Sequence, residues 1–486
     1  MTQRDQRTAA GLFLICFLCY AWFFSGGGWN QNAHFDLARA VVERGTLYID
    51  GYHLNTGDVS VSDASGQRHA YINKPPGASF LAAIPYAPLY YLEKASGIDV
   101  DSWAAIQLNA YIVTVFTCGL TGALIPLLLF RYARERVAAP PVIAALAALA
   151  IALGTIVFPY STMLFSHVPA ALFLLLAFVW LDKRPLLAGM SAGIAGITYL
   201  LCIPVAIVFF VVKLTQSRRD AFRFAAGGIP FGLILGAYQY VCFGSAFRTS
   251  LEISTRFTRE GLFLGVFGLP DSEALWGLTF SEYRGLFHVS PVLLFVIPGL
   301  WWMFRRNLRR EAVMIVAAFA ILLFANAAFN NWEGGSAFGP RYLIPAIPLL
   351  GVPLLFVRGG WTMIAAVMLG VASFAIQIVA TAVDPMPAGW IQHPVRDYML
   401  PAFTGHAPKF VGQTSINTQS IDEPLPHAKY PRGSHESAWA SFNLGEVLTG
   451  PGENTSVLPI AIFVIAGSGA LLRYARAGED TRAPKA

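Results

Sequence analysis

Residues 103–136 read WAAIQLNAYIVTVFTCGLTGALIPLLLFRYARER, and this stretch decides the fold class. Residues 103–130 contain no charged side chain, whereas Arg131, Arg134 and Arg136 follow directly. An apolar helix of this length crosses the roughly 30 Å hydrocarbon core of a bilayer, and Lys/Arg clusters beside such helices stay in the cytoplasm. The stretch therefore predicts a membrane-spanning helix that ends inside the cell.

The rest of the chain has the same apolar character. Its 486 residues are 55% hydrophobic and 13% charged, with a mean hydropathy of +0.54, which excludes a soluble domain of ordinary composition. The net charge of +6 is distributed over helix ends instead of one basic face, so no nucleic acid partner is expected. All five cysteines lie in apolar segments, and the outer loops should lack disulfides. The sequence predicts an all-α polytopic membrane protein.

The placement of Lys and Arg predicts about twelve transmembrane helices, with both termini in the cytoplasm and an uncleaved first helix. The expected organisation is a transmembrane catalytic domain over residues 1–382, with outer loops at 26–102 and 244–286. An extracytoplasmic loop region, 383–456, follows. Residues 457–486 supply the last transmembrane helix and a cytoplasmic tail.

Two segments admit alternative topologies. In the first, residues 77–92 lie flat along the outer interface, and residues 186–212 cross the membrane twice as short helices broken near 198–204. In the second, 77–92 span the membrane and 186–212 form one long helix. The second topology leaves Arg131, Arg134 and Arg136 outside the cell, so the positive-inside trend favours the first.

An amphipathic helix is predicted in the first outer loop, from Asn32 to Glu43. Its apolar face carries Ala33, Leu37 and Val41, and its polar face carries Asn32, Asp36, Arg39 and Glu43. We expect this helix to lie flat on the membrane, with Asp36 at the boundary between water and lipid. A carboxylate there is placed to act as a general base. Simple pairing with Arg39, or capping of the helix, is the alternative interpretation.

Three basic residues are candidate phosphate ligands. Lys74 lies just before a predicted helix start, where the ammonium and the helix dipole both favour an anion, although snorkelling to the interface also explains a lone Lys. Arg284 and Arg341 enter apolar segments from the outer side, against the positive-inside trend. Arginine binds phosphate oxygens bidentately. Pairing with Glu282 or Glu333 is the alternative role for these arginines.

Residues 159–169, PYSTMLFSHVP, break two apolar helices at the outer face. Such breaks are tolerated where the backbone meets water or is covered by protein. His167 is thereby a candidate ligand, a candidate acid or base, or a helix cap.

These motifs together resemble the GT-C superfamily of polyprenyl-phosphate-sugar-dependent glycosyltransferases. Residues 36–45, DLARAVVERG, and 73–77, NKPPG, look like the first outer loop of the branch that holds protein O-mannosyltransferases and lipid A aminoarabinose transferases. Residues 160–167, YSTMLFSH, and 338–342, FGPRY, look like motifs of uncharacterised bacterial members. The resemblance covers residues 1 to about 350.

The resemblance implies a glycosyltransferase that moves a hexose or pentose, with inversion, from a polyprenyl-phosphate donor to a cell-envelope lipid, glycan or protein. The site would face outward from the bacterial inner membrane, among membrane lipids. A first-loop carboxylate would deprotonate the acceptor. The family's acidic pair falls on Asn30 and Gln31, and an amide cannot act as a base. The base is therefore expected at Asp36, with Asp58 second, while Lys74 matches the family's phosphate-contacting lysine.

The predicted site follows from both arguments. Its catalytic residues are Asp36 and Asp58, its phosphate ligands are Lys74, Arg284 and Arg341, and its lining residues are Asn30, Gln31, His34, His167 and Glu333. No cofactor is certain. A divalent metal stays an open alternative, although His167 occupies a position where relatives often carry an acidic residue, which argues against a metal ligand there.

Two other functions remain to be weighed. A lipid-linked glycan flippase should carry ionisable groups at mid-membrane, whereas here nearly all of them map to helix ends, which argues against it. A catalytically inactive envelope scaffold is kept open by Asn30 and Gln31.

Overall fold

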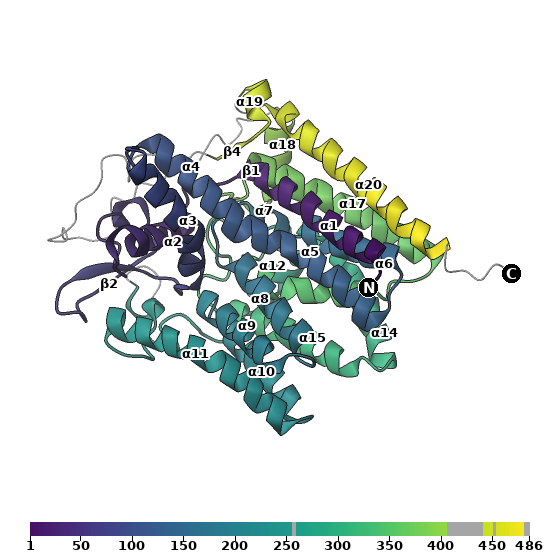
Figure 1. The fold of residues 1–486 in the computed structure, drawn as a ribbon, viewed down its shortest axis with the longest axis horizontal. Helices are drawn as coiled ribbons and strands as arrows, with labels where there is room; N and C mark the ends of the chain where they lie inside the picture. Colours follow the sequence, from purple (N-terminus) through teal and green to yellow (C-terminus); the bar gives the residue numbers. More distant parts are fainter. Residues whose placement is uncertain (255–258, 406–440, 451–452, 481–486) are drawn as a thin grey trace.

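The computed structural model describes residues 1–254, 259–405, 441–450 and 453–480, and Figure 1 shows them as a layered bundle of helices. Helix α2 (Trp29–Arg39), strand β2 (Val59–Ser62) and helix α3 (Gly77–Ala95) gather at one end of the bundle. The N-terminus and the end of α20 (Leu458–Asp480) lie at the opposite end. Half of the predicted loop region 383–456, namely residues 406–440 and 451–452, lies outside the described residues.

The apolar helices follow one another in the predicted order. Within the described residues, five are long and apolar enough to cross a membrane: Trp103–Val137, Arg218–Phe243, Arg309–Ala327, Gly360–Val383 and Asn454–Ala477. Shorter apolar helices are Pro141–Leu153, His167–Trp180, Pro185–Thr198, Cys202–Leu214, Pro291–Arg305 and Arg341–Leu354. The helical, polytopic class is confirmed, and the number of spans stays a prediction.

Several of these segments consist of more than one helical element. The further α-helices are α1 (Gln3–Ala21), α4 (Trp103–Thr114), α5 (Leu120–Tyr132), α6 (Pro141–Leu153), α7 (Val157–Ser161), α8 (His167–Trp180), α9 (Pro185–Thr198), α10 (Cys202–Leu214), α11 (Arg218–Phe243), α12 (Ser272–Thr279), α13 (Leu286–Val289), α14 (Val296–Arg305), α15 (Arg309–Ala327), α16 (Gly351–Leu354), α17 (Gly360–Val383), α18 (Leu400–Phe403) and α19 (Glu446–Thr449). Short 3₁₀ or π turns lie at Ala40–Arg44, His53–Asn55, Val115–Gly119, Ala133–Val137, Ser250–Ile253, Pro291–Phe295, Arg341–Leu350, Pro394–Met399 and Asn454–Val457.

The break predicted between residues 198 and 204 is present. Helix α9 begins with Pro185 at its first turn, where a missing N–H costs nothing, and ends at Thr198. Tyr199 then adopts an extended backbone, and α10 starts at Cys202. Two short helices therefore replace the single long helix of the alternative topology.

Helices α9 and α11 pack backbone against backbone. A Cβ added at Gly189 would overlap the carbonyl oxygen of Phe224, and one added at Gly227 would overlap the carbonyl oxygen of Leu186. Helices inside a membrane commonly pack closely through small residues, because surrounding lipid removes the hydrophobic driving force for helix association. This contact fixes α9, whose C-terminal end leads into the break before α10.

Two small antiparallel sheets interrupt the helical fold. Strand β2 pairs with β3 (His69–Ile72) within the first outer loop, and β1 (Phe23–Phe24) pairs with β4 (Phe442–Asn443). The all-α class holds, and these two short sheets add to it. The hairpin shapes the loop, because β3 runs directly into Asn73 and Lys74.

The predicted flat helix of the first outer loop exists, but its polar face does not meet water. Residues 30–40 are all buried, and a π turn follows α2. Arg39 lies 2.6 Å from Glu43 and stacks on the ring of Tyr52, and Tyr86 donates a hydrogen bond to Glu43. The face that amphipathic periodicity assigned to solvent is instead covered by the loop and α3.

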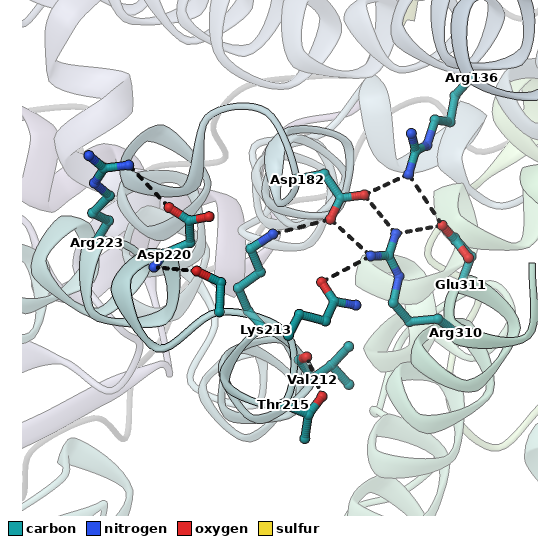
Figure 2. Close-up of polar contacts among 11 residues, drawn as sticks. Arg136, Asp182, Val212, Lys213, Thr215, Asp220, Arg223, Arg310 and Glu311 are labelled. Carbon is teal, nitrogen blue, oxygen red and sulfur yellow. Dashed lines mark hydrogen bonds and ion pairs between the residues drawn. The ribbon is translucent and has the colours of Figure 1, made fainter.

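A cluster of ion pairs ties four segments together at the end opposite α2, and Figure 2 shows it. Asp182 accepts from Arg136 at 2.7 Å, from Arg310 at 2.7 and 2.9 Å and from Lys213 at 3.4 Å. Arg310 also donates to Glu311 at 2.6 Å. Every charge of this group, called here the Asp182 cluster, has an opposite charge beside it.

Candidate active site

A cavity of about 390 Å³ lies where the first outer loop meets the helix breaks. Its walls come from residues 73–75 before α3, from the α7–α8 and α9–α10 junctions, from residues 249–251, 263, 264 and 267, and from the end of α15 and the segment that joins it to Arg341. Helix ends present side chains and unpaired backbone groups together, so these junctions bring polar groups to a recess with a largely apolar wall.

Lys74 and Asp58 form an ion pair at the edge of this recess. The Lys74 Nζ lies 3.1 Å from Asp58 Oδ1, and Lys74 lines the cavity. Both side chains are largely buried, with 20% and 8% of their surfaces exposed. Asp58 is also close enough to interact electrostatically with Arg341 and His34. Of the two predicted catalytic carboxylates, Asp58 is the one held beside the cavity.

The turn that carries Asp58 is fixed to α2 by short hydrogen bonds. Asn32 Nδ2 donates to the Asn55 carbonyl at 2.7 Å, and Thr56 Oγ1 donates to the Trp29 carbonyl at 2.7 Å. The Asp58 N–H in turn donates to Thr56 Oγ1 at 3.1 Å. The main chain of Asp58 therefore has little freedom, and the carboxylate is preorganised.

Asp36 occupies a different place from the one expected. It is fully buried, accepts a hydrogen bond from Asn55 Nδ2 at 3.0 Å, and is absent from the residues that line the cavity. Burial raises the pKa of the Asp36 carboxyl well above its usual range, although the Asn55 hydrogen bond and Arg39 act against this shift. Asp36 holds the turn that carries Asp58 and has no direct access to the cavity.

The two predicted arginines have different surroundings. Arg341 lines the cavity, lies over the rings of Phe165 and Tyr342, and has no carboxylate within 4 Å among the described residues. Arg284 is fully buried, and donates to the carbonyls of Glu333 at 3.1 Å and Gly335 at 2.8 Å. Arg284 thus clamps a loop, whereas Arg341 keeps a cation available to a ligand.

Three further predicted lining residues do not reach the cavity wall. Glu333 contributes its carbonyl to Arg284, and Gln31 Nε2 lies 3.0 Å from the Met386 sulfur. His34 pairs through Nδ1 with Ser79 at 3.0 Å. Burial first, and then the charge of Lys74, lower the pKa of His34 to about 3, so this ring is neutral near pH 7.

Asn30 and His167 do line the cavity, together with two asparagines that the sequence interpretation missed, Asn73 and Asn326. All four are at most 5% exposed, and each has side-chain nitrogen or oxygen atoms without a hydrogen-bond partner in the described structure. Asn326 had a usable signal, because it is an uncharged polar residue near the end of the apolar segment 312–329, where polar side chains are costly and mark functional sites. Asn73 adjoins Lys74 and was overlooked.

The residues present do not offer a metal site. No group of three or more His, Cys, Asp or Glu side chains comes together within the described part of the chain. His167 is surrounded by the rings of Phe165, Tyr199 and Tyr342, and no carboxylate pairs with it there. No chemical step is therefore assigned to a divalent cation.

Comparison with known proteins identifies the fold. No protein-family model and no curated protein matches the chain. Solved structures do match, and among them are two of ArnT from Cupriavidus metallidurans, one bound to undecaprenyl phosphate and the other in the apo state. Their TM-scores are 0.51 and 0.50, and each is 13% identical to this chain. They cover 97% and 96% of this chain, which in turn covers 77% and 75% of theirs.

The likeness extends over nearly the whole chain, and at this identity it establishes the fold alone. The expected resemblance is confirmed in the fold that this chain shares with ArnT. Evidence for an activity comes from the residues of the cavity.

Proposed function

We propose that this protein is a membrane glycosyltransferase that transfers a sugar from a polyprenyl-phosphate-linked donor to a hydroxyl group of a cell-envelope acceptor. The acceptor is a lipid, a glycan or a protein, and transfer takes place on the extracytoplasmic face of the bacterial inner membrane. The observation that carries the proposal is a single cavity with a largely apolar wall. It is lined by Lys74, whose ion-pair partner Asp58 lies beside the cavity, and by Arg341, which has no acidic partner among the described residues.

The cavity suits an amphipathic donor. Lys74 and Arg341 supply positive charge for a phosphate, and arginine can present two parallel N–H groups to its oxygens. The remaining wall is apolar and aromatic, through Leu200, Leu201, Leu251, Phe263, Phe267 and Phe329. A lipid-linked phosphate needs this combination, because its head must be neutralised while its chain stays out of water.

The chemistry follows from the charges. Asp58 accepts the proton of the acceptor hydroxyl as the hydroxyl oxygen attacks the anomeric carbon. The bond from that carbon to the phosphate oxygen breaks, and the lipid phosphate leaves with the electron pair. Because negative charge grows on the phosphate, cations fixed in a partly dry recess stabilise the transition state more than the bound donor. A direct displacement of this kind inverts the anomeric centre.

Lys74 serves both groups. Its ammonium pairs with Asp58 at 3.1 Å, and it lies at the cavity wall where the leaving phosphate gains charge. Arg341 provides the second contact. Asp36 acts on the turn beneath Asp58 and takes no proton from the acceptor.

Membranes from cells that express the full-length protein provide the test. They receive a radiolabelled pool of polyprenyl-phosphate sugars, and label is followed from the acid-labile lipid donor to an acid-stable product. Wild type should convert the pool, and Asp58→Asn should not. Label that stays on the lipid and only changes leaflet would point to a flippase. An inert wild type that also fails to bind undecaprenyl phosphate would support the scaffold.

A further inference from the structure

The cavity holds more polar groups than the reaction centre uses. Both side-chain atoms of Asn73 and Asn326 and both ring nitrogens of His167 lack partners among the described residues, as does Asn30 Oδ1. A buried polar group without a hydrogen bond is destabilising, and native proteins retain such groups mainly where a ligand or water completes them. These four side chains therefore mark a position for a polar ligand group.

The chemical type of these side chains restricts that ligand. A carboxamide offers an N–H donor and a C=O acceptor side by side, and a sugar hydroxyl is itself both donor and acceptor. Asn30, Asn73 and Asn326 together present this pairing from α2, from the segment before α3 and from α15. The geometry fits a group rich in hydroxyls better than one dominated by a charge.

The charges of the recess point the same way. No Asp or Glu is found among the described residues lining the cavity, and the neighbouring carboxylate, Asp58, already pairs with Lys74. Lys74, Arg341 and Asp58 together leave one net positive charge. A sugar linked to a lipid through one phosphate is a phosphodiester with one negative charge, so the two charges balance.

We propose that the donor carries an uncharged, hydroxyl-rich sugar on a single phosphate, read by the amides of Asn30, Asn73 and Asn326. This inference rests on the proposed glycosyltransferase function and names the donor class within it. An amino sugar would bring an ammonium group to two cations with no free carboxylate, and burying an unpaired charge is costly. A uronic acid or a diphosphate linkage would add a negative charge that the recess does not neutralise.

Binding to the purified full-length protein tests this inference without knowledge of the acceptor. The probes are undecaprenyl phosphate alone, and the same lipid phosphate joined to glucose, to 4-aminoarabinose or to glucuronic acid. The glucose-linked lipid should bind at least about tenfold more tightly than the aminoarabinose- and glucuronate-linked lipids, and more tightly than the bare lipid phosphate.

Asn326 provides the sharpest variants. Asn326→Leu should remove the gain in affinity that glucose confers, and should raise the Tm by a few degrees, since an unsatisfied buried amide is replaced by an apolar side chain. A purely structural asparagine would lower the Tm instead. Asn326→Asp should shift the preference toward the aminoarabinose-linked lipid. Asn307→Asp makes the same change at an exposed position away from the cavity and should leave the order of affinities unchanged.

Each outcome decides the matter. Tighter or equal binding of an amino sugar or uronic acid donor would overturn the inference while leaving the glycosyltransferase proposal intact. Equal affinity for all sugar-linked and bare lipids would show that the amides read no sugar, and would also overturn it. Failure of every lipid phosphate to bind would remove the proposed function itself.

Discussion

The two ends of the helical bundle use the same charged residue types in opposite ways. In the Asp182 cluster every cation faces a carboxylate, and the hydrogen bonds run between segments far apart in the chain (Figure 2). In the outer cavity Arg341 lacks a carboxylate partner among the described residues, and nearby amides and an imidazole have unused donors and acceptors. Fully paired charges stabilise the fold, whereas a charge without a partner in a recess is available to bind a ligand.

The same distinction separates two pairs of residues of the same type. Asp36 and Asp58 both belong to the first outer loop, but Asp36 is sealed beneath it while Asp58 meets the cavity through Lys74. Arg284 and Arg341 both start an apolar segment, but the Arg284 guanidinium already donates hydrogen bonds to backbone carbonyls. Substitutions in these two pairs test most directly whether paired and unpaired charges have different roles.

The largest effect is expected at Asp58. Asp58→Asn removes the proton acceptor and should lower kcat by about 10²- to 10⁴-fold. Asp36→Asn should change kcat by less than about threefold, because the amide oxygen can still accept the hydrogen bond from Asn55. Steady-state transfer rates measured across a range of pH give both effects. The rate of wild type should rise with pH as the base loses its proton, and Asp58→Asn should lack this rise.

Asp36→Leu supplies the control, since it cannot accept from Asn55 and should loosen the turn that holds Asp58. Loss of activity in Asp36→Asn equal to that in Asp58→Asn would assign the base to Asp36 and reject the present arrangement.

An intermediate effect is expected at the arginines. Arg341→Gln should weaken binding of undecaprenyl phosphate and reduce kcat/KM by about 10- to 10³-fold, because the phosphate loses a cation. The Tm should change little, because Arg341 pairs with no carboxylate among the described residues and its loss leaves no buried negative charge unpaired. Arg284→Gln should instead destabilise the protein by roughly 2–4 kcal/mol, since the carbonyls of Glu333 and Gly335 lose their donor. Ligand affinity and thermal unfolding, measured on both variants, separate the roles. Reversed assignments would contradict the comparison.

The sequence predicted what depends on local patterning. Apolar length and Lys/Arg placement sufficed for the order of the helices and for the break after Thr198, because both are set by residues adjacent in the chain. Lys74 and Arg341 were found at the cavity because they stand beside helix starts at the outer ends of apolar segments, and their roles there stay predictions.

What the sequence left open depends on tertiary partners. Periodicity assigned Asp36 to a solvent face, but the loop folds back and buries that face, which no pattern within residues 32–43 records. Arg284 looked like Arg341 until the carbonyls of residues 333 and 335 were placed beside it. The hairpin of β2 and β3 was missed because its alternation is short, and Asn326 was read as part of a span.

The smallest effect is expected at the other end of the bundle, and it tests whether paired charges are purely structural. Asp182→Asn should lower the free energy of unfolding by about 1–2 kcal/mol without changing transfer by the folded protein, because three cations lose their shared carboxylate. Asp220→Asn removes a similar carboxylate from an exposed pair with Arg223, three residues away, and should have an effect below about 0.5 kcal/mol.

The dependence of this stability on pH has a definite sign. Burial raises the pKa of Asp182, but Arg310 and Lys213 outweigh it and hold the pKa below its ordinary value of 3.8. A carboxyl with a depressed folded-state pKa stabilises the protein above the unfolded pKa, and this contribution disappears as the pH falls through the folded pKa. The difference in Tm between wild type and Asp182→Asn should therefore stay constant from pH 8 to about 5 and shrink below about pH 4. A difference that grew on acidification would mean that Asp182 is not held ionised by its cations.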